Sequence, residues 1–325
     1  MKQLLIAVSA IMFALPVAAQ LNPELPELDK FIDEVVDEFG FDRDELIDLF
    51  AQVEVKQSIL NAIARPAERV RPWHEYRNIF ITPARIKGGV NFWKNNAETL
   101  AQAEQQYGVP AEIIIAILGV ETNYGGNMGS FRVIDALSTL AFRYPPRSPF
   151  FRSELKHFLV LTQEEQMSRL DPVGSYAGAM GLGQFMPSSY RAYAVDFSND
   201  GKRDIWTNPV DAVGSIANYL KVHGWVRGES VVHPAKLEGD VPQSLLERGL
   251  RPATSREELR VMDVHMPDLP PGDDQLTLFS LTQLDGDEYW LGRQNFYAIT
   301  RYNHSRMYAM AVYQLANEIR QAYEN

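Results

Sequence analysis

The chain of 325 residues contains no cysteine. Disulfide bonds, thiolate nucleophiles and cysteine-ligated zinc sites are therefore excluded, and so is a lipid anchor attached to an N-terminal cysteine. The six histidines have no spacing typical of metal ligands, and no His-Glu-x-x-His pattern occurs. We therefore expect no catalytic zinc.

Positive charge is also scarce. Lysine and arginine total 31 against 42 aspartates and glutamates, which gives a formal charge of −11. This balance argues against a surface built for the phosphate backbone of a nucleic acid or for anionic lipid. We therefore expect no nucleic-acid partner. Long hydrophobic runs are also missing after the N-terminus, so we expect no membrane anchor.

The N-terminus reads MKQLLIAVSAIMFALPVAAQ, with one lysine, an apolar stretch over 4–15 and small residues at 17–19. This is the pattern of a secretory signal peptide, and we expect cleavage after Ala19. The alternative is a membrane anchor, but the apolar stretch is shorter than the roughly 20 residues that span a bilayer. The pattern therefore predicts a soluble protein of the bacterial periplasm.

The chain does contain enough apolar sequence for a folded core, since 46% of its residues are hydrophobic and 11% are aromatic. Apolar residues at spacings of three and four predict a mostly helical protein. The predicted helices cover 28–39 (ended by Gly40), 46–53, 90–107 (ended by Gly108), a segment that starts at Pro110 and continues through Glu121, and roughly 151–170, 209–223 and 307–323. The proline-broken segment 64–80 is expected to be an ordered loop.

Residues 231–290 have a different pattern. Two extended runs in this segment meet at Asp285-Gly286, which is typical of a β-hairpin. We therefore expect an α+β fold that is mostly helical. Its predicted regions are a signal peptide at 1–19, a helical α domain at 20–100, a central region at 101–230, a small β-containing domain at 231–290 and a C-terminal segment at 291–325 that returns to the centre.

The segment IIIAILGVETNYGG leads a run of apolar residues directly into Glu121. On a helix, Ile117 and Leu118 share the face of this glutamate, which also lies near the C-terminal end. Burial and the helix dipole both raise its pKa, and the protonated form is the one that a general acid needs. The alternative is a structural ion pair with Arg132 or Arg143. The environment of Glu121 alone leaves both interpretations open.

A glycine-rich stretch, GSYAGAMGLGQFMPSSY, covers 174–190. It fits neither a dinucleotide-binding fingerprint nor a phosphate-binding Walker loop, and it is not a nucleophile elbow. One interpretation is a tight turn that leads into a helix. In the other, Ser175 and Gln184 offer hydrogen bonds to a polar ligand that the glycines allow to come close.

The stretch DFSNDGKRDIWTNPVD, residues 196–211, is similar to a calcium-binding EF-hand loop. Positions 1, 3, 5, 6, 7 and 9 of that motif are filled by Asp196, Ser198, Asp200, Gly201, Lys202 and Asp204. Position 12 is Thr207 instead of glutamate, and the next carboxylate is that of Asp211, which a longer loop could bring round. The alternative is an aspartate-rich turn without a metal.

A tyrosine-rich stretch, NFYAITRYNHSRMYAMAV, lies near the C-terminus and includes Tyr302, Asn303 and Tyr308. Tyrosine combines an apolar face with a polar tip, which suits stacking on sugar rings. The alternative is that these are core aromatics of the last helix.

Taken together and in this order, these blocks resemble the membrane-bound lytic murein transglycosylase B family, glycoside hydrolase family 103. The matching segments are IIIAILGVETNYGGNMG, GSYAGAMGLGQFMPSSYRAYAVDFSNDGKRDIW, PVDAVGSIANYLKVHGW and NFYAITRYNHSRMYAMAV. The resemblance extends from about residue 24 to the C-terminus and is weakest over 231–290. Lipid-anchored members carry a cysteine at the signal cleavage site, so this chain resembles the soluble forms.

The resemblance implies a lysozyme-like catalytic core at 101–230, with an EF-hand-like loop, between an α domain and a small β domain. Its implied substrate and partner is the peptidoglycan glycan strand, and the implied protein partners are cell-wall synthases or amidases. The single catalytic acid and base of the family falls on Glu121, and no catalytic cofactor is implied. Implied muropeptide contacts are Tyr76, Ser175, Met180, Gln184, Tyr219, Tyr302, Asn303 and Tyr308. Implied ligands of a structural calcium ion are Asp196, Ser198, Asp200, Lys202 through its carbonyl, and Asp211, in a loop one residue longer than the family pattern.

Family members cut the bond between N-acetylmuramic acid and N-acetylglucosamine and leave a 1,6-anhydro-muramoyl end instead of adding water. The resemblance therefore implies that Glu121 protonates the glycosidic oxygen and then acts as a base on the muramoyl C6 hydroxyl. Because this nucleophile is intramolecular, a second carboxylate is not required. Asp135 or another distant carboxylate could still fold close to Glu121. The competing hypotheses are a lysozyme-type hydrolase that uses water and a non-catalytic peptidoglycan-binding protein.

Overall fold

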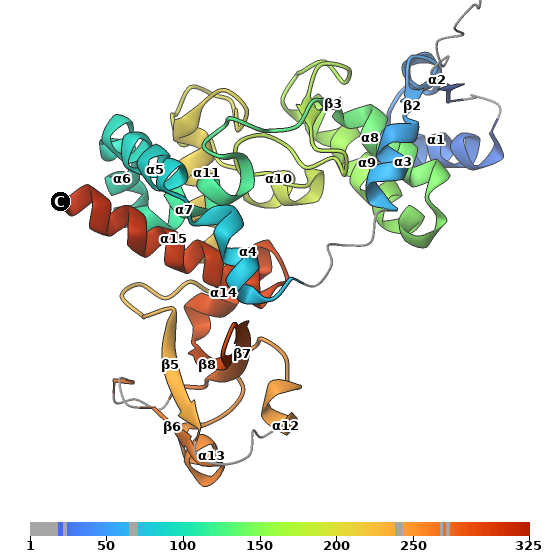
Figure 1. The fold of residues 1–325 in the computed structure, drawn as a ribbon. Helices are drawn as coiled ribbons and strands as arrows, with labels where there is room; N and C mark the ends of the chain where they lie inside the picture. The colour runs from blue at the N-terminus through green and yellow to red at the C-terminus, as the bar shows by residue number, and fades with distance from the viewer. Residues whose placement is uncertain (1–18, 22–24, 65–70, 238–242, 267–268, 271–273) are drawn as a thin grey trace, which may run out of the picture.

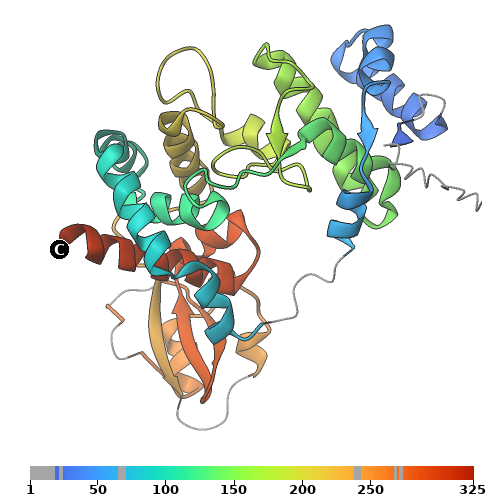
Figure 2. The ribbon, with the colours of Figure 1, turned by 45° about the horizontal axis from the view of Figure 1, so that its top comes forward.

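The computed structural model describes residues 19–21, 25–64, 71–237, 243–266, 269–270 and 274–325. The predicted signal peptide therefore lies, apart from Ala19, outside the described residues. As the sequence predicts, the protein is α+β and mostly helical, with small antiparallel sheets. Its elements form three groups in space, which Figures 1 and 2 show from two directions.

The first group joins the N-terminal helices to two helices from the middle of the chain. Its members are α1 (Pro26–Phe39), α2 (Arg43–Phe50), α3 (Gln57–Ile63), α8 (Val133–Arg143) and α9 (Ser148–Glu164). Leu28, Phe31 and Val35 form the buried face of α1, and Gly40 ends that helix in a left-handed conformation, as predicted. In both views α8 and α9 lie beside α1 and α3, although some 70 residues separate α3 from α8 in the sequence.

The second group is the central bundle. It contains α4 (Trp73–Phe80), α5 (Pro83–Asn95), α6 (Ala97–Tyr107), α7 (Ala111–Thr122), α10 (Pro187–Tyr193), α11 (Pro209–Val222), α14 (Gln294–Tyr302) and α15 (Arg306–Glu324). Helix α7 is buried on all sides from Ala111 to Gly119, as its apolar sequence predicts. The chain enters and leaves this bundle more than once, so the spatial grouping does not coincide with the expected boundary at residue 100.

Helices α7 and α15 pack side by side in the centre of this bundle. Near the start of α7, the buried carboxylate of Glu112 accepts hydrogen bonds from the guanidinium of Arg320 at 2.5 and 2.8 Å. Near its end, Glu121 is bonded to Tyr308 of α15. The two helices therefore run antiparallel, and a polar contact at each end fixes their relative register.

The third group is a small sheet with its own core. Strands β5 (Val232–Leu237), β6 (Val264–His265), β7 (Thr277–Gln283) and β8 (Gly286–Gly292) pair in the antiparallel order β6-β5-β8-β7. The predicted hairpin is present, but its two-residue turn is Leu284-Asp285, one residue before the predicted Asp285-Gly286. Gly286 is the first residue of β8 and adopts a positive φ. Helices α12 (Gln243–Leu246) and α13 (Arg256–Val261) complete this group, whose separate apolar cluster includes Leu245, Leu259 and Leu291.

Short elements connect these groups. Strand β1 (Ala19–Gln20) pairs with β2 (Glu54–Val55), and β3 (Phe131–Arg132) pairs with β4 (Val173–Gly174). A 3-10 turn covers Pro145–Arg147. No helix in the described part of the chain is long and apolar enough to cross a membrane.

Several local predictions are wrong. Residues 73–80, expected to be in a loop, form α4, because Pro72 precedes the helix as its N-cap and does not interrupt it. The predicted helix 90–107 is two helices, α5 and α6, which meet at Asn96. Pro110 is likewise the N-cap of α7 instead of its first residue. The tyrosine-rich stretch forms two helices, α14 and α15, with a break at 303–305.

Candidate active site

Glu121 lies in the last turn of α7, and its side chain is partly buried. Its Oε1 accepts a hydrogen bond of 2.6 Å from the hydroxyl of Tyr308, a residue that is only 3% exposed. Burial raises the pKa of Glu121 from its usual value to about 7, while the hydrogen bond from Tyr308 opposes this shift. Glu121 therefore gains and loses its proton near neutral pH, well above the range of an ordinary glutamate.

The sequence left open a structural ion pair between Glu121 and an arginine. The structure does not contain this ion pair among its described residues. Arg132 forms two hydrogen bonds of 2.8 Å with Asp135. Among the described residues, no lysine, arginine or histidine forms an ion pair with Glu121. Asp135 is 1% exposed and also accepts the backbone N–H of Glu54. Its carboxylate is thus engaged on α8 and does not form a pair with Glu121.

The chain reverses direction immediately after Glu121 through an unusual turn. Asn123, Tyr124 and Gly125 all have positive φ, with values of 52°, 61° and 90°. The hydroxyl of Thr122 donates to the carbonyl of Leu182 at 2.9 Å and accepts the N–H of Gly125 at 3.0 Å. These bonds hold a backbone that non-glycine residues rarely adopt, and they attach the end of α7 to the glycine-rich stretch.

Tyr124 is held in a cradle of three glycines. Its hydroxyl donates to the carbonyl of Arg85 on α5 at 2.7 Å. A Cβ atom at Gly88, Gly89 or Gly119 would lie 2.6–2.8 Å from an atom of the Tyr124 side chain. No larger residue fits at these positions without displacing the tyrosine, and its ring joins α5 to α7 directly behind Glu121.

Three of the four predicted contact tyrosines, at positions 219, 302 and 308, lie near one another. The ring centroid of Tyr302 is 4.7 Å from that of Tyr219. Burial raises the pKa of Tyr302 well above its usual value, and the charge of nearby Glu121 raises it further. The hydroxyl of Tyr302 donates to the carbonyl of Gly183 at 2.6 Å, and that of Tyr219 donates to the carbonyl of Arg301 at 2.5 Å. Tyr76 on α4 is close enough to Tyr308 to affect its titration.

The glycine-rich stretch forms a compact loop before α10. Ser175 caps a turn within it, because its hydroxyl oxygen accepts the N–H groups of Ala177 and Ala179 at 3.3 and 3.0 Å. Gln184 has a positive φ of 53°, and its amide donates to the carbonyls of Met128 and Gly181. The loop is thus a tight turn that leads into a helix and also presents polar side chains near the end of α7.

Two predicted contacts differ in accessibility. Met180 is 0% exposed, and its backbone pairs with Phe185, so a contact between its side chain and a ligand would require the loop to open. Asn303 is exposed at the break between α14 and α15.

The predicted site residues come from α4, α7, the glycine-rich loop, α11, α14, α15 and the break before α15. Their roles in binding a ligand stay predictions.

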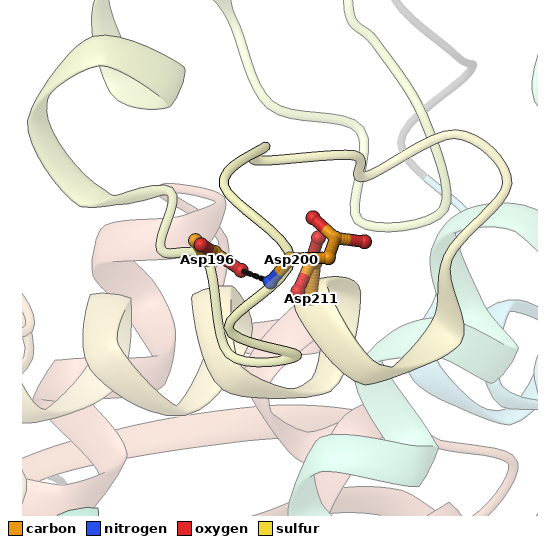
Figure 3. Close-up of side chains that lie close together, drawn as sticks. All are labelled: Asp196, Asp200 and Asp211. Atoms are coloured by element: carbon orange, nitrogen blue, oxygen red, sulfur yellow. Dashed lines mark hydrogen bonds between the residues drawn. The ribbon is translucent and has the colours of Figure 1, made fainter.

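A second cluster of carboxylates lies in the loop between α10 and α11 (Figure 3). One oxygen from each of Asp196, Asp200 and Asp211 lies within 4.8 Å of the others. Asp211 is fully buried, and its carboxylate accepts three backbone N–H groups, those of Phe197, Ser198 and Asp204. None of the three aspartates forms an ion pair within the described part of the chain.

This donor set fits a calcium ion. Calcium binds oxygens at about 2.3–2.6 Å, so ligands on opposite sides of the ion are about 5 Å apart. Ser198 lies beside Asp196, and the N–H of Lys202 donates to Asp200, so the predicted ligands gather round one loop. Thr207, at position 12 of the motif, is bonded to Asp204 instead and leaves the last place to Asp211.

Sequence reasoning missed Thr122 and Tyr124. Both follow Glu121 directly, but their roles depend on contacts with Leu182 and with glycines of α5 that are far away in the sequence. The only local signal was the Asn-Tyr-Gly-Gly sequence, since asparagine and glycine favour positive φ.

A family model described as the transglycosylase SLT domain matches residues 24–317. The chain belongs to this transglycosylase family. It is also 45% identical over 306 residues to membrane-bound lytic murein transglycosylase B of Escherichia coli (strain K12). This alignment covers 90% of this chain and 82% of the relative. The resemblance drawn from the motif blocks is therefore confirmed.

Solved structures agree with this assignment. Soluble lytic transglycosylase SltB1 of Pseudomonas aeruginosa is 54% identical, with a TM-score of 0.88 over 92% of this chain and 100% of its own. The lytic transglycosylase Slt35 of E. coli in complex with calcium is 43% identical, with a TM-score of 0.85 over 93% of this chain and 95% of its own. The predicted fold class is confirmed by these matches.

The contact between Tyr308 and Glu121 predicts the direction of a pKa change. Because the tyrosine hydroxyl donates to the carboxylate, it stabilises the charged form, and Tyr308→Phe should raise the pKa of Glu121 further above 7. Carbon-13 NMR titration of the glutamate carboxyl groups measures this, and Glu121→Gln identifies the resonance. Tyr313→Phe on the same helix is the matched control. An unchanged or lowered pKa in the Tyr308 variant would contradict the arrangement.

Proposed function

We propose that the protein is a lytic murein transglycosylase in which Glu121 acts first as the acid and then as the base. The observation that carries this proposal is a partly buried carboxyl group with a pKa of about 7, bonded to Tyr308 and without a cationic partner among the described residues. Such a group exists in both protonation states near neutral pH, as a residue that donates and then accepts a proton must.

In the first step, protonated Glu121 donates its proton to the oxygen that links N-acetylmuramic acid to N-acetylglucosamine. The bond from the anomeric carbon to this oxygen breaks, and the leaving sugar takes the proton. The Tyr308 hydroxyl, whose own pKa is raised by burial and by the charge of Glu121, stays a hydrogen-bond donor and stabilises the carboxylate that results.

In the second step, the carboxylate of Glu121 accepts the proton of the muramoyl C6 hydroxyl, and the C6 oxygen bonds to the anomeric carbon. The product is a 1,6-anhydro ring, Glu121 is protonated again, and no water is consumed. The nucleophile belongs to the same sugar, so its effective concentration is high. A hydrolase usually needs a second carboxylate to activate water or to attack the sugar. The one carboxylate that the sequence analysis named as a candidate, Asp135, is paired with Arg132.

The proposed contacts with the glycan surround this carboxyl. Tyrosine rings at 76, 219 and 302 offer apolar faces to sugar rings, and the amides of Gln184 and Asn303 offer hydrogen bonds to N-acetyl groups. Ser175 and Met180 shape the loop that carries Gln184. The wider proposal is a periplasmic enzyme, released by cleavage after Ala19, that acts on peptidoglycan and works beside cell-wall synthases or amidases.

Replacing the acid with its amide tests the mechanism. Glu121→Gln keeps the shape of the side chain but cannot donate or accept the proton, so kcat should fall by at least about 100-fold. Mass spectrometry of products released from purified sacculi gives both the rate and the chemistry. Wild-type protein should leave anhydro-muramoyl ends.

Each competing hypothesis predicts a different outcome of the same experiment. Reducing muramic ends in place of anhydro ends would indicate a hydrolase that uses water. Binding of sacculi without release of soluble fragments would indicate a non-catalytic protein. Undiminished release by Glu121→Gln would refute the role of this carboxyl in either reaction.

We propose that the loop between α10 and α11, residues 196–211 and here called the aspartate loop, holds one structural calcium ion. A solved structure of the E. coli relative is in complex with calcium. The ion would be bound by Asp196, Ser198, Asp200, the Lys202 carbonyl and Asp211. Its charge would neutralise three clustered carboxylates, and it takes no part in the reaction. The loop supports the site indirectly, because the carbonyl of Ile205 accepts the N–H of Leu182 in the glycine-rich loop at 2.9 Å.

Removal of the metal should therefore affect stability more than chemistry. We expect chelation to lower Tm by about 5 °C or more, with a smaller change in activity at moderate temperature. Asp211→Asn should lower Tm and abolish the response to chelator, whereas Asp171→Asn, an exposed aspartate outside the loop, should keep it. A Tm that stays the same when elemental analysis shows the metal to be absent would contradict the proposal.

A further inference from the structure

The side chain of Thr122 lies where the end of α7 meets the glycine-rich loop. It is only 1% exposed. Its hydroxyl donates to the carbonyl of Leu182 at 2.9 Å, and the carbonyl of Leu118 is farther away at 3.3 Å. The same oxygen accepts the N–H of Gly125 at 3.0 Å. One buried hydroxyl therefore bonds the helix that carries Glu121, the turn that follows this helix and a loop 60 residues later.

The hydroxyl of Thr122 reaches out of its own helix. The usual partner of a threonine hydroxyl inside a helix is the carbonyl four residues earlier. At this position that carbonyl belongs to Leu118 and is the more distant of the two acceptors. The shorter bond, to Leu182, leaves α7, so it fixes the helix relative to another segment of the chain.

Leu182 directly precedes two residues of the proposed site. The carbonyl of the next residue, Gly183, accepts the hydroxyl of Tyr302 at 2.6 Å. Gln184, a proposed glycan contact, follows with a positive φ of 53°. Because these loop residues are consecutive, the bond from Thr122 to Leu182 controls where the loop holds Gln184 relative to the end of α7.

The turn after Thr122 also depends on this hydroxyl. Asn123 and Tyr124 have φ values of 52° and 61°, which cost free energy in residues other than glycine. Such a turn persists where its surroundings hold it, and here Thr122 holds the N–H of Gly125. Without this acceptor, the N–H would favour a turn that opens to water. The last turn of α7 would then fray, since helix ends leave carbonyls without partners in the helix.

Glu121 is the residue that such fraying affects first. It directly precedes Thr122, and its Oε1 is bonded to Tyr308 at 2.6 Å. Burial, which raises the pKa of Glu121, has a larger effect than the Tyr308 bond, which lowers it. Water that enters a frayed turn removes both effects. The pKa of Glu121 would therefore fall from about 7 toward that of an ordinary glutamate.

We propose that the hydroxyl of Thr122 positions the acid of the reaction, by holding Glu121 and the loop that carries Gln184 in one fixed arrangement. This inference rests on the proposed function, because it gives Thr122 a place in that reaction. The hydrogen-bond partners of Thr122 are backbone groups, so it acts through Glu121 as a positioning residue and not as a catalytic one. Its contribution should therefore be found mainly in kcat and only weakly in KM.

Three substitutions at this position separate the hydroxyl from the shape of the side chain. Thr122→Val keeps the shape and loses the hydrogen bonds, Thr122→Ser keeps the hydroxyl, and Thr122→Cys replaces it with a thiol that bonds weakly. Thr162→Val is the matched control. Thr162 is also 1% exposed and lies near the end of α9, and its hydroxyl donates to the carbonyl of Leu159 in the same helix at 2.8 Å.

For each variant of the full-length protein, we would measure kcat and KM on purified glycan strands, the pKa of Glu121 by carbon-13 NMR, and Tm. In Thr122→Val, kcat should fall about tenfold with KM within about twofold of wild type, and the pKa of Glu121 should fall below 7. Thr122→Ser should keep the wild-type pKa and most of kcat, and Thr122→Cys should lie between these two variants. Thr162→Val should lower Tm without changing kcat or the pKa of Glu121.

A purely structural role predicts a different result for Thr122→Val. If Tm falls as it does in Thr162→Val while kcat and the pKa of Glu121 keep their wild-type values, the inference is overturned. A folded Thr122→Ser that loses as much activity as Thr122→Val would also overturn it. If Thr122→Val does not fold, Thr122→Cys decides, because an unchanged pKa and kcat in that variant contradict the inference and lowered values support it.

The same measurements separate this inference from the proposed function. Failure of the wild type to cleave the glycan would overturn the proposed function. The NMR titration needs no turnover, so a wild-type pKa of Glu121 in Thr122→Val would count against the positioning role whether or not cleavage is observed.

Discussion

The hydrogen bond between Tyr308 and Glu121 is the interaction on which the rest of the account depends. It joins α15 to α7 at the point where α7 brings a carboxyl group to the end of an apolar helix. The surroundings raise the pKa of this group, and the tyrosine limits the rise, so the balance comes to about 7. The second contact between these helices, from Arg320 to Glu112, lies at their other ends and fixes the register that makes the first contact possible.

Other features of the fold keep the carboxyl in place. Three successive residues with positive φ end α7 abruptly, and Thr122 ties this turn to the glycine-rich loop. Tyr124 fills a space that glycines on α5 and α7 leave open for it. The glycine-rich loop is in turn bonded to the aspartate loop through Leu182 and Ile205. A series of direct contacts thus connects the aspartate loop to the end of α7, which gives a structural metal a physical reason to influence the site.

Patterns of neighbouring residues correctly predicted individual helices, a helix end and a hairpin. The buried helix that ends at Glu121, the stop at Gly40 and the hairpin between β7 and β8 all followed from apolar spacing or turn residues. The order of the motif blocks indicated the family and, through it, the lysozyme-like class of fold. The residue assignments at the candidate site came from this resemblance more than from chemistry that the sequence alone could demonstrate.

Predictions failed where distant contacts decide the structure. Nothing local distinguishes one helix over 90–107 from two that meet at Asn96, because the break allows α5 and α6 to pack on different neighbours. Arg132 pairs with Asp135, and no cation among the described residues pairs with Glu121. This was one of several arrangements that the sequence allowed. The cradle around Tyr124 joins residues 35 positions apart, and no periodic pattern reports such a contact.

The central claim is that Glu121 must carry a proton when the reaction begins. The pH dependence of kcat/KM on purified glycan strands tests this most directly, because it reports the ionisation of essential groups in the free enzyme. We predict that kcat/KM falls as the pH rises through about 7 in a single ionisation, which is absent from the residual activity of Glu121→Gln. A kcat/KM that stays constant through pH 7 and declines only near pH 4 to 5, where an ordinary glutamate is protonated, would contradict the claim.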